Sequence, residues 1–140
     1  MSSTASYSLP PIGVVRSQLT TTVGAPKQGW EGAPEAWVEI DPAFGKALDG
    51  VAAGEDAILL TRLHLGRRDV LQVHPRDDPA NRLTGVFATR APNRPNPIGL
   101  HRVRVLEIAE NTRLRVKPLE VVDGTPVVDI KPVLPSVVDA

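Results

Sequence analysis

The chain has no cysteine, and aromatic residues make up only 4% of its 140 residues. The absence of cysteine excludes disulfides, thiolate metal sites and cysteine nucleophiles. The scarcity of aromatics leaves little from which to build a platform that stacks exposed bases. No apolar run approaches the roughly 18 residues of a membrane-spanning helix, so the sequence predicts no membrane partner.

A net charge is also lacking, because 16 basic residues balance 16 acidic ones. No overall field therefore draws the chain to RNA or to an anionic membrane, and any nucleic-acid contact would need a local basic patch. Residues 1–8 are polar, lack the apolar stretch of a signal peptide and are expected to form a disordered lead-in. We take a cytoplasmic protein as the default.

Proline and glycine, by contrast, are abundant, with 14 and 11 residues, and this abundance disfavours long helices. A chain of this length is expected to fold as one domain, here residues 9–138. Short strand-like segments recur at regular spacing with turn residues between them. The sequence therefore predicts a mainly β fold, a small closed or nearly closed β-barrel with one short helix and long Pro/Gly-rich loops.

The individual elements follow from periodicity and turn chemistry. Asp41 and Pro42 suit the N-cap and first position of a short helix over residues 42–48. Asn111 and Thr112 predict a hairpin turn between two alternating segments. The segments predicted as strands are 12–15, 37–40, 57–65, 69–74, 85–89, 103–108, 113–117 and 127–130.

The most informative stretch is residues 90–101, which read R-A-P-N-R-P-N-P-I-G-L-H. Its three prolines exclude a helix interior and a central strand, and each extends the residue before it. The result is a stiff loop that holds arginine and asparagine side chains at little ordering cost. Such a loop between two strands is a natural ligand clamp, although a proline-rich surface connector would have a similar composition.

Two acidic positions near the end of the chain are candidates for chemistry. Asp123 opens a D-G-T-P turn and is expected to be structural. Asp129 alternates with apolar neighbours, so its side chain is predicted on a polar face that it shares with Lys131. Asp129 and Lys131 are the candidate catalytic pair. The alternative is a surface hairpin whose exposed Asp–Lys pair contributes little.

The remaining motifs bear on the binding of nucleotides, metals and phosphates. No dinucleotide-binding fingerprint, phosphate-binding loop or zinc-protease motif is present. The three histidines, at 64, 74 and 101, lack the spacing of a metal site, and we expect no metal. Two strands also present a row of basic residues, which could hold phosphates or form a solvated face of the barrel. This row consists of Arg102, Arg104, Arg113, Arg115 and Lys117.

Four segments together resemble the TrmO/TsaA-like family. They read I-G-V-V-R-S at 12–17, A-P-K-Q-G at 25–29, G-V-F-A-T-R-A-P-N-R-P-N-P-I-G-L at 85–100 and D-G-T-P-V-V-D-I-K-P at 123–132. Their order and spacing agree with the family across about residues 12–135. The chain is expected to be a short form of the family, without a C-terminal extension.

The resemblance implies an S-adenosylmethionine-dependent methyltransferase built on a small β-barrel. The best-known members methylate the exocyclic N6 of a threonylcarbamoyl-modified adenosine beside the tRNA anticodon. The resemblance also implies a homodimer. Carried over by motif, the cofactor-binding residues would be Pro26, Lys27, Gln28, His64, Arg90, Leu100, Leu119 and Glu120. Asp129 would remove the proton from the weakly nucleophilic amine. The alternatives are a small-molecule methyl acceptor and a non-catalytic module that only binds S-adenosylmethionine.

Overall fold

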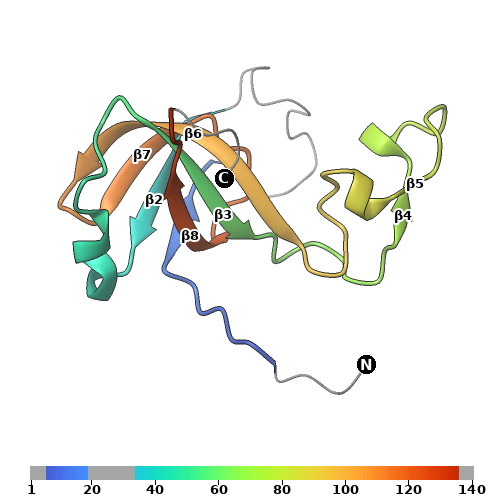
Figure 1. Cartoon of the computed structure of the whole chain (residues 1–140), viewed down its shortest axis with the longest axis horizontal. Coiled ribbons are helices and arrows are strands. Elements are labelled where there is room, and N and C mark those ends of the chain that lie inside the picture. Colours follow the sequence, from blue (N-terminus) through green and yellow to red (C-terminus); the bar gives the residue numbers. More distant parts are fainter. Residues whose placement is uncertain (1–5, 19–33, 136–140) are drawn as a thin grey trace.

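Six of the described strands close into an antiparallel barrel in the order β1–β2–β7–β6–β3–β8 (Figure 1). The computed structural model describes residues 6–18 and 34–135. The barrel strands are β1 Gly13–Arg16, β2 Ala36–Ile40, β3 Asp56–Arg62, β6 Ile98–Ala109, β7 Arg113–Lys117 and β8 Pro126–Pro132. The expected mainly β, closed-barrel fold is confirmed.

The barrel core follows from residues that alternate along each strand. In β2, Val38 and Ile40 point inward and are buried, whereas Trp37 and Glu39 between them lie on the outer face. The neighbouring β7 buries Leu114 and Val116 in the same way. All six strands contribute buried apolar side chains to one cluster. Apolar surface removed from water on one side of each strand is therefore what closes the barrel.

The short helix is present where it was predicted. Element η1 is a 3-10 helix over Pro42–Leu48, and the Asp41 carboxylate accepts a 2.9 Å hydrogen bond from the Ala43 backbone N–H. Pro42 occupies the start of the helix, where its missing N–H is not needed. Leu48 is buried in the barrel core, so the helix covers one end of the barrel.

Two tight turns also match the sequence. Glu110 and Asn111 between β6 and β7 have φ angles of 57° and 56°, the pattern of a type I′ hairpin turn. Such a turn twists in the direction that the two strands require. In the turn before β8, Gly124 has a φ of 87°, which a residue with a side chain adopts only at a cost.

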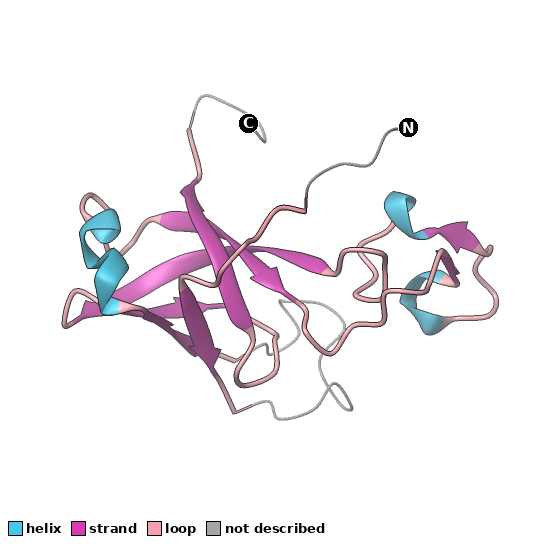
Figure 2. Cartoon of the chain, turned by 90° about the horizontal axis from the view of Figure 1, so that it is seen from below, coloured by secondary structure: helices cyan, strands magenta, loops and turns pink. Residues whose placement is uncertain are grey.

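Residues 63–97, which we call the arm, leave the barrel between β3 and β6 and form a separate lobe beside it (Figures 1 and 2). The arm contains the two-stranded sheet of β4 Gln72–Val73 and β5 Thr84–Gly85. It also contains the 3-10 helices η2 Pro75–Asp77 and η3 Val86–Ala88. In the described part of the chain, no helix is long and apolar enough to cross a membrane.

The arm is where the predicted elements are wrong. The segment 85–89 is no strand, because β5 ends at Gly85 and the Thr89 N–H closes a 3-10 turn onto Val86 O at 3.0 Å. The segment 69–74 keeps only two strand residues, and β3 stops at Arg62 rather than at residue 65. Short apolar runs without a strand partner have no ladder to join, so local turns decide their conformation.

Candidate functional site

The proline loop, residues 90–97, is held rigidly against the start of the arm. The Arg67 N–H donates to Asn93 Oδ1 at 2.8 Å, and the Arg68 guanidinium donates to Pro95 O and to Asn96 Oδ1, both at 2.8 Å. Arg94 donates to Thr89 O at 2.9 Å and thereby closes the loop on itself. The Oδ1 atoms of the two asparagines and the Arg94 guanidinium therefore hold the loop in shape.

Arg90 is the exception in this loop. Its side chain is exposed and has no hydrogen bond or ion pair among the described residues. Two cavities meet beside it. One, the loop cavity, has a volume of about 770 Å³ and lies between the proline loop and the start of β6. The other, the arm cavity, has a volume of about 740 Å³ and lies between the arm and the segment before β8.

The structure brings several predicted cofactor residues to these two cavities. Arg90 and Glu120 line both of them. Leu100, from the outer face of β6, lines the loop cavity, and His64 lines the arm cavity. These four residues come from separate segments of the chain, and each lines one or both of the adjoining cavities. Arg90 and Glu120 therefore mark the centre of the candidate site.

The remaining predicted cofactor residues do not appear among the cavity linings. Leu119 is 1% exposed and packs in the barrel core. Pro26, Lys27 and Gln28 lie outside the described residues. The residues that flank their segment are informative, because Ser17 Oγ donates to Val121 O at 2.8 Å and Pro34 O accepts from the Leu119 N–H at 3.3 Å. The described residues on either side of 19–33 therefore lie beside the segment that carries Glu120.

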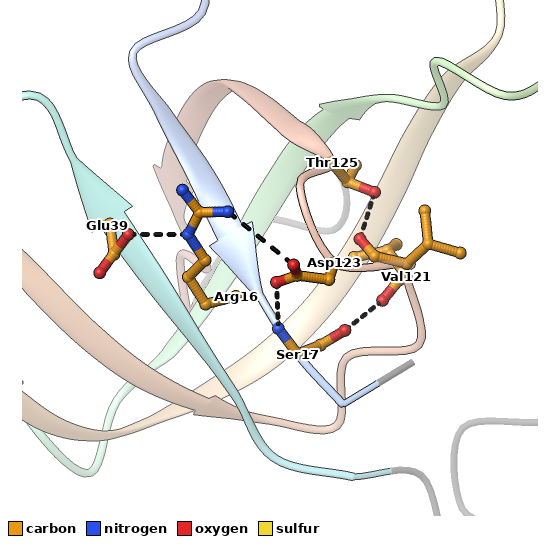
Figure 3. A network of polar contacts seen from close by, with 7 residues as sticks. Arg16, Ser17, Glu39, Val121, Asp123 and Thr125 are labelled. Carbon is orange, nitrogen blue, oxygen red and sulfur yellow. Dashed lines mark hydrogen bonds and ion pairs between the residues drawn. The ribbon is translucent and has the colours of Figure 1, made fainter. Parts of the chain in front are cut away.

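A polar network fixes the segment that carries Glu120 (Figure 3). The Asp123 carboxylate accepts a 3.1 Å hydrogen bond from the Ser17 N–H and lies 3.9 Å from the Arg16 guanidinium. Arg16 also pairs with Glu39 at 3.0 Å, and Thr125 Oγ1 donates to Val122 O at 2.7 Å. Asp123 thus ties the end of β1 to the turn before β8, the structural role expected of it.

Sequence reasoning did not single out His101 as a site residue, yet its ring forms part of the loop cavity wall. His101 Nε2 lies 2.8 Å from Oγ1 of Thr61, which is fully buried. Burial lowers the pKa of His101 to about 4, so the ring is neutral near pH 7. Gly99 fits beside this pair only because it has no Cβ. A sequence signal for His101 was present, because Gly99, His101 and Val103 alternate along the strand that follows the proline loop and so share its inward face.

Asp129 and Lys131 lie apart from this site. They form an ion pair of 3.0 Å on β8, with side chains 46% and 58% exposed respectively. They line a third cavity of about 410 Å³, next to η1 and Asp56, and they are absent from the linings of the loop and arm cavities. The shared polar face expected of Asp129 and Lys131 is present, but within one chain the pair lines a different cavity from Arg90.

The predicted row of basic residues is largely neutralised by carboxylates. Arg102 and Arg104 both pair with Asp56, at 3.0 and 2.9 Å, and their hydrogen bonds lower the pKa of that carboxyl group. Arg115 pairs with Glu35 at 2.7 Å and with Glu107 at 3.0 Å. Arg113 stacks 4.4 Å above the centre of the Trp37 ring. This face of the barrel is a charge-balanced, solvated surface.

Comparison with known proteins adds to this geometry. A family model described as the tRNA-methyltransferase O N-terminal domain matches residues 14–140. A protein of Methanothermobacter thermautotrophicus, named "Probable S-adenosyl-L-methionine-binding protein", is 47% identical over 122 residues, which cover 87% of this chain and 86% of the relative. An Archaeoglobus fulgidus protein, named "S-adenosyl-L-methionine-binding protein", is 40% identical over 92% of this chain and 91% of its own length.

Solved structures agree with the sequence relatives. The crystal structure of TrmO from Pseudomonas aeruginosa superposes with a TM-score of 0.75 and is 35% identical in sequence. The match covers 99% of this chain but 61% of that one. A second TrmO crystal structure gives a TM-score of 0.74 at 37% identity, again with 62% of that chain covered. The chain therefore spans about three fifths of the solved TrmO chains that it matches.

Proposed function

Because the chain belongs to the family of tRNA-methyltransferase O N-terminal domains, we propose that it transfers a methyl group from S-adenosylmethionine to an adenosine of tRNA. Its relatives bear the name of S-adenosylmethionine-binding proteins, and S-adenosylmethionine is the family's cofactor. The observation that carries the proposal is the position of Arg90, a guanidinium without a protein partner among the described residues, where two cavities adjoin.

The residues of the site fit the chemistry of S-adenosylmethionine. Arg90 can form a two-pronged hydrogen bond with a ligand carboxylate, such as the one at the amino-acid end of the cofactor. Leu100 and Pro92 give the loop cavity apolar surface against which an adenine ring can lie. Glu120 places a carboxylate at the same junction, suited to the cationic groups of the ligand. Both cavities fall within the usual size of a small-molecule site.

Two adjoining cavities suit a reaction between two bound molecules. S-adenosylmethionine supplies, when bound, a methyl group activated by its sulfonium charge. Arg90 and Glu120, which line both cavities, would fix the cofactor so that this methyl group faces the neighbouring space. An adenine exocyclic amine is a weak nucleophile, because its lone pair is delocalised into the ring. Holding the two reactants in line at contact distance would therefore supply much of the rate.

We propose further that the protein works as a homodimer. Ile98 and Leu100 are 47% and 49% exposed on the outer face of β6. Leu60 on β3 pairs in register with Leu100 on one side and with Asp129 on the other. Asp129 thus lies on the same outer face, about 10 Å across two strands from Leu100. If copies meet on this face, Asp129 of one subunit can reach the methyl acceptor at the other subunit's Arg90, with Lys131 beside it.

The acceptor that we propose is the N6 atom of threonylcarbamoyl-adenosine next to the tRNA anticodon. A tRNA substrate also fits the cytoplasmic location expected from the sequence. The second candidate is a module that binds S-adenosylmethionine without transferring its methyl group, and the names of the two archaeal relatives, which mention binding alone, favour it. A small-molecule methyl acceptor is a further alternative, supported by the size of the adjoining cavities.

A methyl-transfer assay separates these candidates. The purified protein is mixed with S-adenosylmethionine labelled in its methyl group and with tRNA that does or does not carry threonylcarbamoyl-adenosine. The proposal predicts label in the modified tRNA alone. Binding of S-adenosylhomocysteine without transfer to either tRNA would contradict it and favour the other candidates.

In the same assay Asp129→Asn is expected to cut turnover while cofactor affinity is kept, and unchanged turnover would exclude Asp129 as the base.

A further inference from the structure

The charges of this neutral chain are unevenly divided between barrel and arm. The arm, residues 63–97, carries six arginines and three aspartates, which give it a net charge of +3 (6 − 3), and the rest of the chain must carry −3 to keep the total at zero. Every cationic residue of the arm other than its histidines is arginine. Arginine binds phosphate oxygens through a planar fork of donors, which the ammonium of lysine lacks.

Fewer of the arm arginines than of the barrel arginines form ion pairs with carboxylates among the described residues. On the barrel, Arg16, Arg102, Arg104 and Arg115 all form ion pairs with carboxylates. On the arm, Arg67 pairs with Asp69. Arg68 and Arg94 donate to backbone carbonyls and to an asparagine amide, which fix the side chains but do not cancel their charge. The side chains of Arg82 and Arg90 have no hydrogen bond or ion pair among the described residues.

Apolar side chains accompany this positive charge. Phe87, on η3, is 82% exposed, although its neighbour Val86 is buried. Leu71 and Leu83, at the β4–β5 sheet, are 68% and 47% exposed. Phe87 lies three residues before Arg90 and directly before Ala88, which lines the arm cavity, so the exposed aromatic ring belongs to the same segment as the candidate site. Positive charge together with an exposed ring is the combination that holds single-stranded RNA, through its phosphates and by stacking on an unpaired base.

We propose that the arm is the RNA-binding surface of this protein. In this proposal Arg82 contacts the phosphates, and Phe87 stacks on an unpaired base next to the nucleotide that accepts the methyl group. The inference rests on the proposed function for the identity of the RNA, a tRNA anticodon loop. It assigns RNA contact to the lobe that projects from the barrel, while the charge-balanced outer face of β6 and β7 takes no part. Asp77 and Asp78, which would repel phosphates, are gathered at one turn of the arm, around η2.

Binding of a fluorescent anticodon stem-loop RNA to the full chain tests this assignment. Phe87→Ala is expected to weaken binding about ten-fold with an unchanged salt dependence, because base stacking is lost and no charge is removed. Phe87→Trp should bind as the wild type does. Arg82→Ala is expected to weaken binding several-fold and to lower the slope of log affinity against log salt by roughly 1.

Lys46→Ala is the matched control for charge, because Lys46 is exposed on η1, across the barrel from the arm (Figure 1). It is expected to bind RNA as the wild type does, and all variants should keep their affinity for S-adenosylhomocysteine, which shows that they fold.

If the wild type binds RNA and both arm variants bind it equally well, the assignment of RNA binding to the arm is wrong, whereas the proposed function is not contradicted. If the wild type binds no RNA, both the assignment to the arm and the proposed action on tRNA are contradicted. If Phe87→Ala changes the sedimentation of the protein but not its RNA affinity, the arm is an interface between copies.

Discussion

At the scale of single residues, the candidate site depends on which polar side chains are already occupied. Asn93, Asn96 and Arg94 satisfy hydrogen bonds that shape the proline loop. Arg90 alone among the arginines of this loop is left for a ligand. The sequence showed that the loop would be rigid, because its prolines fix the backbone. The sequence did not show which polar groups of the loop would form hydrogen bonds within the protein. Those bonds depend on Arg67 and Arg68, which precede the loop by more than twenty residues and donate to it.

Arg90→Ala tests the residue on which the site is centred. Loss of a charge-assisted hydrogen bond, about 1.5–3 kcal/mol, should weaken the affinity for S-adenosylhomocysteine about ten-fold or more. Calorimetric titration measures this change directly. Arg62→Ala is the control, because Arg62 is exposed at the end of β3 and lines neither cavity. Equal affinities in the two variants would remove Arg90 from the site.

His101 makes the stability of the fold depend on pH. Burial lowers its pKa from 6.5 to about 4, so in this interval the unfolded chain binds a proton that the folded chain does not. The free energy of unfolding should therefore fall as the pH drops from about 6.5 to 4, by up to about 3 kcal/mol. Above pH 6.5 this contribution is constant.

Urea unfolding of the wild type and of His101→Gln at several pH values isolates this effect. Glutamine can keep a hydrogen bond to Thr61 but does not titrate, so the variant should lose less stability over this interval. The carboxyl group of Asp56, whose pKa is lowered by Arg104 and Arg102, titrates at lower pH and is common to both proteins. Parallel pH curves for wild type and variant would contradict the assigned role of burial.

At the scale of elements, the strands with a partner on both sides were the predictable ones. The predicted 113–117 strand coincides with β7, and η1 begins and ends where its Asp–Pro start and the following turn require. β6 begins earlier than predicted, at Ile98, because its first residues pair with β3 along the exit of the proline loop. In the arm, Val86 and Ala88 carry a strand-like pattern but fold into a 3-10 turn, since no barrel strand lies beside them.

Gly124→Ala tests the turn that positions the segment before β8. Gly124 has a φ of +87° and open space around its Cβ position, so the cost is conformational and should lower the free energy of unfolding by about 1 kcal/mol. Gly85→Ala is the matched control, with equally open space but a φ of −61° that alanine adopts freely. Urea denaturation compares the two. A Gly124→Ala variant as stable as Gly85→Ala would show that the turn relaxes.

At the scale of the whole molecule, the closed barrel was predictable and the lobe beside it was not. Regular spacing of short strands predicts a barrel, because each strand must bury one face and the sheet must cover its edges. The arm has little such periodicity, and many of its hydrogen bonds close local turns or join side chains to the backbone within the arm itself. Asp129 shows the same limit, because alternation placed it on the outward, polar side of its strand but could not tell that it lines a different cavity from Arg90.

The proposed homodimer gives a prediction at this scale. Ile98→Glu places a charge on the exposed outer face of β6, next to Leu100. An unpaired charge in an apolar interface is costly to bury, so the variant should dissociate at concentrations at which the wild type is dimeric. Sedimentation velocity measures the difference, with Phe44→Glu, an exposed apolar residue of η1, as the control. Identical sedimentation of wild type and Ile98→Glu would place any interface elsewhere.

The central claim is that this barrel binds S-adenosylmethionine beside Arg90 as a methyltransferase does. Calorimetric titration with S-adenosylhomocysteine, the product that keeps both the adenosine and the amino-acid tail, tests it most directly. We predict saturable binding at about one ligand per subunit with a dissociation constant in the micromolar range or tighter, equivalent to about 8 kcal/mol or more. Absence of detectable binding would mean that the chain keeps the fold of its family without the cofactor site.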